Sequence, residues 1–337
     1  MKQTIVVNRC SLHLAMCLGF AAVFAFSGCR PDTNSNAAAQ QDAVSVVATV
    51  GMVADLVRYV GGDQITVTQL MGAGVDPHLY KPTRDDVQRI TDADVVFYSG
   101  LMLEGRLTDI LEKLSRKKPV VAITTKLSAA GLITDAETGE HPDPHVWMDI
   151  SAWSSCLDVI VATLAQQIPS EAMGFQSRAD ELRMELSRLH DYGIHSLATI
   201  PEAQRVLVTS HDAFSYFGRA YGLEVLGVQG ISTDSEAGLQ RINELVDLLV
   251  QRQISAVFVE SSVPQKNIQA LIEGAESRGH HVAIGGELFS DAMGAGGTYE
   301  GTYIGMLDHN ITLVTRALGG TAPEAGLNGK LDQAEAK

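Results

Sequence analysis

Cysteine and positive charge are both scarce in this 337-residue chain, and each shortage excludes a class of protein. The four cysteines, at positions 10, 17, 29 and 156, are too few and too scattered for a zinc knuckle or a disulfide framework. Lys and Arg total 25 against 40 Asp and Glu, which gives a formal net charge of -15. Because so acidic a surface repels phosphate backbones, we expect no nucleic-acid partner.

The apolar run near the N-terminus is too short to span a membrane. It covers Ser11 to Phe26, whereas a spanning helix needs roughly 20 residues. It follows the basic residues Lys2 and Arg9 and contains no acidic residue, which is typical of a secretory signal peptide. We therefore predict a signal peptide over residues 1–28 and an exported protein that faces the periplasm or the cell exterior.

The end of this run, Phe26-Ser27-Gly28-Cys29, resembles the lipobox of bacterial lipoproteins, in which the cysteine is lipidated and becomes the new N-terminus. Phe26 departs from the usual Leu, Val or Ile, and an ordinary signal peptide cleaved nearby is the alternative. The polar, Ala-rich residues that follow predict a flexible tether. The resemblance implies lipidation of Cys29, a lipidated tether over 29–43, and attachment to a membrane through that anchor.

The chain as a whole has the composition of a packed globular protein, with 45% hydrophobic and 19% charged residues, and its length suggests about two domains. Short β-branched runs alternate with amphipathic segments, which predicts parallel sheets with right-handed crossovers. The predicted strands cover 44–50, 65–70, 94–99 and 119–123 in the first half and 205–210, 223–229, 255–260 and 281–285 in the second. The predicted helices between them include 52–60, 83–93, 106–116 and 235–252.

A different kind of segment separates the two halves. From about Ser170 to Ile200 the leucines recur at helical spacing, which predicts one helix of roughly 45 Å. The expected fold class is therefore α/β, with two Rossmann-like (β/α) lobes joined by one long rigid helix and a ligand site in the cleft between them. The predicted boundaries are an N-terminal lobe over 44–168, the connecting helix over 169–200, a C-terminal lobe over 201–319 and a flexible tail over 320–337.

Four side chains that bind metals well follow predicted strands or lie in connecting loops. His78 lies in MGAGVDPHLYKPT and His145 in GEHPDPHVWMD, while His211 and Asp291 follow strands of the second half. In open α/β sheets ligands bind beyond the carboxyl ends of the strands, so one metal ion between the lobes can contact all four. Imidazole nitrogens and a carboxylate suit a borderline divalent cation.

Less specific interpretations exist for the same residues. A single loop histidine is more often a surface or hydrogen-bonded residue than a ligand, so spacing alone does not establish a site. A metal-dependent hydrolase is an alternative function, because a metal held by three histidines and an aspartate can activate water. Four protein ligands leave no open position, however, and the sequence has no HExxH, paired-carboxylate or nucleophile-elbow pattern. We expect no enzymatic activity.

Five stretches resemble the corresponding blocks of the solute-binding lipoproteins of manganese- and zinc-type ABC importers (cluster A-I, family 9), particularly the TroA-like members. They are VDPHLYKPTRDD, HPDPHVWMD, VTSHDAFSYFGRAYGLEVLGVQGISTDSEA, VFVESSVPQKN and IGGELFSDAMGAGGTYEGTYIGMLDHN. The resemblance extends from about Val44 to Ala317.

This resemblance implies capture of a divalent transition metal (zinc and/or manganese, with iron a further candidate) and its delivery to an ABC-type permease by a monomer. The implied ligands are His78, His145, His211 and Asp291. Lipoproteins of this family have also been described as adhesins, but the sequence has no repeat or stalk.

The sequence falls between the two metal-specific subgroups of this family. Zinc-specialised relatives carry a long His- and acid-rich loop before the second ligand, and residues 134–144 retain only His141 of it. Manganese-specialised relatives commonly have glutamate as the third ligand, where this chain has His211. Neither Zn2+ nor Mn2+ is therefore favoured as physiological cargo by the sequence.

Three carboxylates are candidates for supporting the histidines. A ligating imidazole usually donates its second N–H to an acceptor, and Asp76 and Asp149 lie near His78 and His145 in the sequence. For Asp149 a helix N-cap is an equal alternative. Glu260 ends a predicted strand and either faces the cleft or pairs with Lys266 on the surface.

Overall fold

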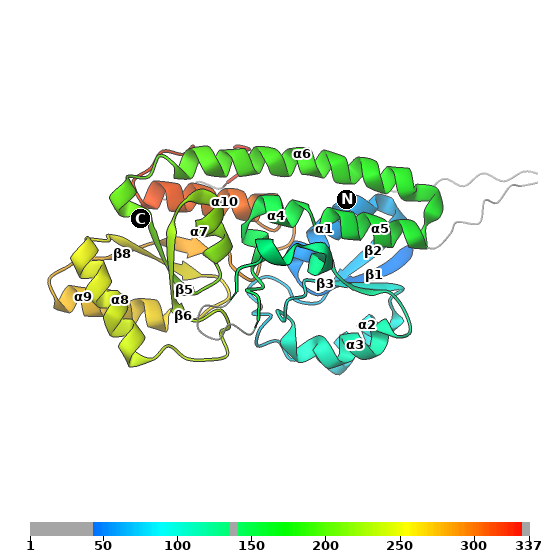
Figure 1. Ribbon diagram of the computed structural model, residues 1–337, viewed down its shortest axis with the longest axis horizontal. Helices are drawn as coiled ribbons and strands as arrows, with labels where there is room; N and C mark the ends of the chain where they lie inside the picture. Colours follow the sequence, from blue (N-terminus) through cyan, green and yellow to red (C-terminus); the bar gives the residue numbers. More distant parts are fainter. Residues whose placement is uncertain (1–42, 135–140, 332–337) are drawn as a thin grey trace, which may run out of the picture. The chain divides into compact units, whose positions relative to one another are not determined.

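The computed structural model describes residues 43–134 and 141–331, which contain all eight predicted strands (Figure 1). The predicted signal peptide, the predicted lipidation site Cys29 and nearly all of the tether lie outside the described residues, as do 135–140 and 332–337. Within the described part, no helix is long and apolar enough to cross a membrane.

The first half of the described chain forms a parallel four-stranded sheet in the order β2-β1-β3-β4. Valine-rich β1 and β3 are the central strands, and their side chains are buried because both faces of the sheet are covered. We call β1 to α5 the N-terminal lobe. Its elements are β1 (Val44–Ala48), α1 (Gly51–Gly61), β2 (Ile65–Gln69), α2 (Arg84–Asp92), β3 (Val95–Tyr98), α3 (Thr108–Ser115), β4 (Val120–Ala122), α4 (Ile150–Ser154) and α5 (Leu157–Gln167).

The second half, which we call the C-terminal lobe, contains two parallel strand pairs, β5-β6 and β7-β8, and β5 lies next to β7. These strands and helices confirm the predicted α/β fold. The helix predicted over 235–252 begins only at Leu239, because residues 231–235 form bends and turns and Gly238 is in an extended conformation. The elements are β5 (Val206–His211), α7 (Ser215–Tyr221), β6 (Glu224–Gln229), α8 (Leu239–Arg252), β7 (Ala256–Glu260), α9 (Lys266–Ser277), β8 (Ala283–Leu288) and α10 (Tyr303–Ala317).

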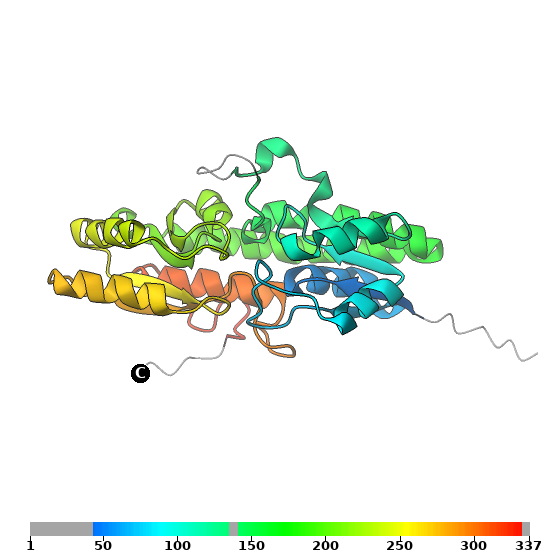
Figure 2. The same ribbon diagram turned by 90° about the horizontal axis from the view of Figure 1, so that it is seen from below.

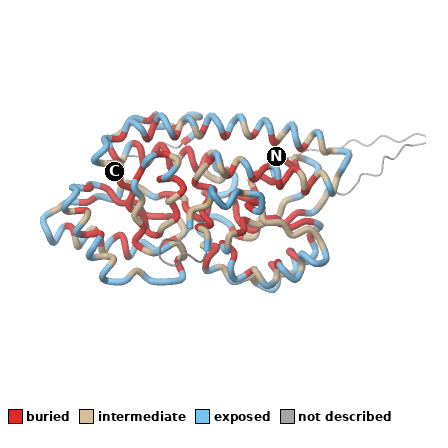
Figure 3. Tube along the Cα trace, viewed as in Figure 1, coloured by how far each residue is buried: buried red, intermediate tan, exposed pale blue. Residues whose placement is uncertain are grey.

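The long connecting helix is α6 (Ala172–Leu197). It packs on α1, α4 and α5 of the N-terminal lobe and on α7 and α10 of the C-terminal lobe, so it runs along both (Figure 1). Its buried side faces these helices and its other side is exposed (Figure 3). The helix is continuous through Gly193, where a larger residue does not fit because its Cβ atom would lie 2.8 Å from the ring of Tyr221.

The lobes also contact each other directly beneath α6. Helices α1 (blue) and α10 (orange-red) meet near the middle of Figure 2. The Tyr303 N–H at the start of α10 donates to the Asp55 carboxylate of α1 at 2.8 Å. One continuous hydrophobic core includes residues from both lobes, with Trp147, Trp153 and Tyr303 among its largest buried side chains. The junction between the lobes is therefore a packed interface as well as a single helix.

The end of the described chain differs from the sequence-based expectation of a flexible tail. Ala322 and Leu331 are buried, and the Leu327 N–H donates to the buried Asp308 carboxylate of α10 at 2.8 Å. Asp308 also accepts a hydrogen bond from Tyr299 at 2.7 Å. Residues 320–331 therefore pack against α10, because a buried carboxylate requires donors that this segment supplies. The Gly- and Ala-rich composition of the segment does not predict that it packs against α10.

Candidate metal centre

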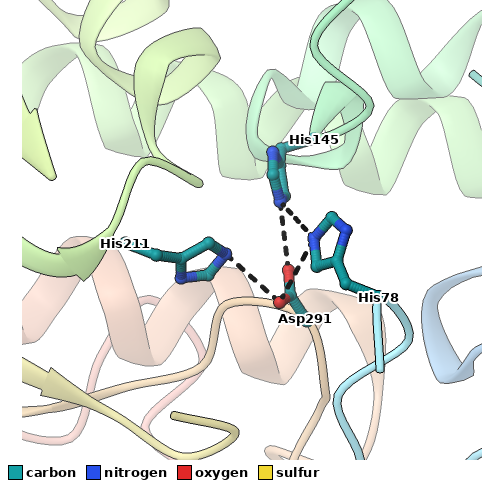
Figure 4. A group of neighbouring side chains, drawn as sticks. All are labelled: His78, His145, His211 and Asp291. Carbon is teal, nitrogen blue, oxygen red and sulfur yellow. Dashed lines mark hydrogen bonds and ion pairs between the residues drawn. The ribbon is translucent and has the colours of Figure 1, made fainter. Parts of the chain in front are cut away.

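The four residues expected to hold a metal come from four separate places in the fold and converge at one point (Figure 4). His78 lies in the loop after β2 and His145 in the segment before α4. His211 is the last residue of β5, and Asp291 follows β8. One ligand atom from each lies within 4.8 Å of every other, so the two lobes each contribute two potential ligands to the same point.

Three of the separations between ligand atoms are close to those expected around a single transition-metal ion. The Nε2 atoms of His78 and His145 are 3.3 Å apart, and His145 Nε2 lies 3.3 Å from Asp291 Oδ1. Asp291 Oδ2 lies 3.2 Å from His211 Nε2 and 3.8 Å from His78 Nε2. Ligands at 2.0–2.1 Å in a tetrahedral site are separated by about 3.3–3.4 Å. Both Asp291 oxygens face the cluster, which allows bidentate as well as monodentate binding.

Two of the imidazoles are oriented by carboxylates on the side away from the centre. His145 Nδ1 lies 2.7 Å from Asp143 Oδ1, and His211 Nδ1 lies 2.6 Å from Glu260 Oε2. The same carboxylates accept the backbone N–H groups of His145 and His211 at 2.9 Å. Each Nδ1–H is thus directed to a carboxylate, and the Nε2 lone pair is left for a metal ion. Glu260 is buried behind the His211 ring, and Lys266 pairs with Glu236.

Asp143 is the supporting residue that the sequence analysis missed. The sequence does contain a signal for it, because Asp-Pro-His occurs twice, at 76–78 and at 143–145. In both copies the aspartate Oδ1 accepts the backbone N–H of the histidine two residues later, at 2.8 and 2.9 Å. Only the second copy also reaches the histidine ring.

The other two candidate carboxylates do different things. Asp149 caps α4 by accepting the N–H groups of Ser151 and Ala152 at 3.1 Å, and its second oxygen lies 3.6 Å from Arg219. The N-cap alternative therefore describes Asp149, and the orienting role proposed for it belongs to Asp143. Asp76 holds the backbone of His78 and accepts a hydrogen bond from Thr233.

Burial and charge set the protonation of the cluster. Burial opposes the charging of His145, but the Asp143 and Asp291 carboxylates outweigh it and raise the pKa of His145 to about 9. His211 is buried to the same degree, and Glu260 and Asp291 raise its pKa well above the ordinary value. Burial would raise the pKa of Asp291, but His211 and His145 hold it well below its usual range. For His78 burial dominates and lowers the pKa to about 4.

Several atoms at the centre have no hydrogen-bonding partner among the described residues other than one another. They include His211 Nε2 and both oxygens of Asp291, all buried. Unpartnered buried polar atoms are uncommon and costly, and a cation bound between them would satisfy all three. His78 is the most exposed of the four, at 7%. It lines a cleft of about 980 Å³ through which an ion can reach the cluster.

Two parallel α/β lobes that place three imidazoles and a carboxylate at their junction define a class of proteins that enclose one small cation. The chain matches the model of the family described as zinc-uptake complex component A, periplasmic (ZnuA), over residues 46–317, and it belongs to that family.

Individual relatives resemble the chain over nearly all of their length. The manganese-binding lipoprotein MntA of Bacillus subtilis is 48% identical over 297 residues, covering 88% of this chain and 96% of that protein. The zinc-binding protein TroA of Treponema pallidum is 41% identical over 312 residues, covering 93% and 98%. A solved structure of the periplasmic zinc-binding protein TroA from Treponema pallidum has a TM-score of 0.80 at 42% identity, covering 82% of this chain and 99% of that one.

Proposed function

We propose that the protein is an extracytoplasmic solute-binding protein that captures one divalent transition metal ion and delivers it to an ABC-type membrane permease. The observation that carries this proposal is the cluster of His78, His145, His211 and Asp291, which is buried and has the spacing of metal ligands. Relatives named as metal-binding lipoproteins support the same function. The metal is cargo, and the partner is the permease that receives it.

We further propose that the bound ion is not catalytic. A catalytic metal needs an open position for water or substrate and a general base nearby. Here three imidazoles and both oxygens of one carboxylate surround the ion's position. Of the additional carboxylates nearby, Asp143 and Glu260 are engaged with the histidine rings, and Asp212 accepts a hydrogen bond from Ser215. Such a site holds an ion tightly without presenting it to a substrate.

Zinc is expected to bind more tightly than manganese at neutral pH. Nitrogen and carboxylate ligands without a thiolate follow the general order in which zinc exceeds manganese. Bidentate binding by Asp291 would raise the coordination number and favour manganese. Manganese therefore stays a candidate for the physiological cargo. The names of the relatives point both ways, since MntA is called manganese-binding and TroA zinc-binding.

Competition titrations of zinc against manganese, with metal analysis of protein purified from its own host, test both the function and the affinity order. Protein lacking residues 1–28 should retain close to one equivalent of metal after dialysis. Retention of no transition metal would contradict the proposed function. Tighter manganese binding would contradict only the affinity order, and a manganese-loaded host protein with tighter zinc binding would show that metal supply selects the cargo.

We propose that residues 1–28 are a signal peptide and that Cys29 carries a lipid anchor at the start of a tether over 29–43. The proposed lobes cover 44–168 and 201–319 and are joined by 169–200, in a monomer. The lipobox-like sequence at 26–29 and the lipoprotein names of the relatives support the anchor.

Replacement of Cys29 by serine should release the protein from the membrane fraction of its host, because no acyl chain can then be attached. Fractionation followed by immunoblotting measures this, and Cys156→Ser, which alters the buried cysteine of the folded part, serves as the control. If the Cys29→Ser protein remains membrane-bound while Cys156→Ser behaves like the wild type, the lipid anchor is wrong.

A further inference from the structure

The loop between β6 and α8, residues 230–238, crosses from the C-terminal lobe to the N-terminal lobe at the cleft. Two consecutive side chains make the crossing. Thr233 Oγ1 donates to Asp76 Oδ2 at 2.6 Å, and Arg106 pairs with Asp234 Oδ1 at 2.7 Å. Thr233 is 8% exposed, whereas the side chains of Arg106 and Asp234 are 36% and 53% exposed. The threonine contact is therefore the better shielded from water of the two.

Thr233 is linked to the candidate metal ligand His78 through one intermediate residue, Asp76. Asp76 Oδ2 accepts the Thr233 hydroxyl, while its other oxygen, Oδ1, accepts the backbone N–H of His78 at 2.8 Å. The carboxylate thus fixes the turn that carries His78, and a residue of the opposite lobe fixes the carboxylate. The two lobes are not covalently connected at this point of the cleft, so this contact depends on the hydrogen bond between Thr233 and Asp76.

His78 depends on this support more than the other two histidines do. His211 is part of strand β5, and its ring is held by Glu260. The segment of His145 is tied to the C-terminal lobe by Tyr216, whose hydroxyl donates to the Asp143 carbonyl at 3.0 Å. His78 instead follows a turn that contains two glycines, Gly72 and Gly74, the latter at φ +70°. Such a turn has little intrinsic rigidity.

We infer that Thr233 is a positioning residue for His78, acting through Asp76 from the opposite lobe. This inference rests on the proposed function. When the lobes are together, the Thr233 hydroxyl orients the Asp76 carboxylate, which holds the His78 turn with its imidazole toward the centre. Any separation of the lobes at the cleft breaks the Thr233–Asp76 hydrogen bond and releases that turn. Loss of the most exposed ligand then opens the site on the side of the cleft, so the bond couples lobe separation to metal release.

Replacement of Thr233 by valine, which keeps the shape and removes the hydroxyl, tests this inference. Outer partners of metal ligands typically change affinity by 10–100-fold, so we expect the metal to dissociate about tenfold faster from Thr233→Val. Transfer of the metal to an excess of a chromophoric chelator measures the rate. Thr233→Ser restores the hydroxyl and should dissociate at close to the wild-type rate. Asp234→Asn removes the neighbouring exposed ion pair and should change the rate by less than about twofold.

Two further measurements separate positioning from a general loss of stability. The thermal unfolding midpoint of the metal-free Thr233→Val protein should fall by only a few degrees, as expected for the loss of one hydrogen bond to a carboxylate, so the variant stays folded in the release experiment. In the background of Asp76→Ala, Thr233→Val should have no additional effect, because the threonine acts through that carboxylate.

An unchanged dissociation rate in Thr233→Val, failure of Thr233→Ser to restore it, or an undiminished effect in the Asp76→Ala background would overturn the inference. Absence of metal binding by the wild-type protein would instead overturn the proposed function.

Discussion

Alanine in place of His145, His211 or Asp291 is expected to weaken metal binding by more than about a hundredfold, beyond the 10–100-fold typical of outer partners. Each of these side chains is almost fully buried, so water cannot readily take its place at the ion. Each substitution also leaves at least one of the remaining polar atoms of the cluster without a partner. His78→Ala should cost less, because this residue borders the cleft and water can occupy the vacated position.

Competition titration with a chelator of known affinity measures these losses, and two variants calibrate them. His281→Ala removes an exposed imidazole, 84% accessible, and should bind metal like the wild type. Asp143→Asn keeps all four ligand candidates but loses the charged acceptor of His145 Nδ1, so a loss of 10–100-fold is expected. Equal binding by His281→Ala and His145→Ala would refute the assignment of the site.

The convergence of the four residues was predictable because it follows from topology. Parallel strands end at the same edge of a sheet, and His211 and Asp291 stand at or just after such ends. The strands themselves were predictable from runs of valine and isoleucine, which both faces of a covered sheet bury. The long helix was predictable from its leucine spacing. The reason for a glycine at position 193 was not, because it depends on the ring of Tyr221, which packs against the helix there.

The supporting residues were harder to predict because their partners depend on side-chain direction. Asp143 and Asp149 lie on either side of His145 in the sequence, and only the backbone turn between them decides which one reaches the ring. The contact of Thr233 with Asp76 joins residues 157 positions apart and has no local signal at all. The docking of residues 320–331 depends on one buried acid, Asp308, whose side-chain direction in the preceding helix α10 is not evident from the sequence.

Metal binding at pH 7 is expected to release about two protons, so that affinity rises steeply with pH. In the metal-free protein, His145 has a pKa of about 9 and the pKa of His211 is also raised well above the ordinary value. Both rings are therefore protonated at neutral pH, with their Nε2 atoms 3.3 and 3.2 Å from the ionised Asp291. A metal ion must displace both of these protons to reach the nitrogens.

The exchange of protons for the ion is balanced in charge. Two protons carry the same charge as one divalent cation, so exchanging them leaves the net charge of the buried cluster unchanged. His78 contributes no proton at pH 7, because burial lowers its pKa to about 4. The proton on His145 competes with the metal below about pH 9, and the raised pKa of His211 adds a second competing proton, so affinity should fall about a hundredfold for each unit of pH lost near neutrality.

Calorimetric titrations in buffers of different ionisation enthalpy, repeated at pH 6, 7 and 8, count the released protons. Glu260→Gln provides the matched variant, because loss of that carboxylate removes the largest influence raising the pKa of His211. We expect the variant to release about one proton fewer than the wild type at pH 7, and its affinity to depend about tenfold less steeply on each pH unit. Release of less than one proton by the wild type at pH 7 would show that the imidazoles are already neutral. The carboxylates of Asp143, Glu260 and Asp291 would then serve to orient the rings without holding protons in the place of the metal.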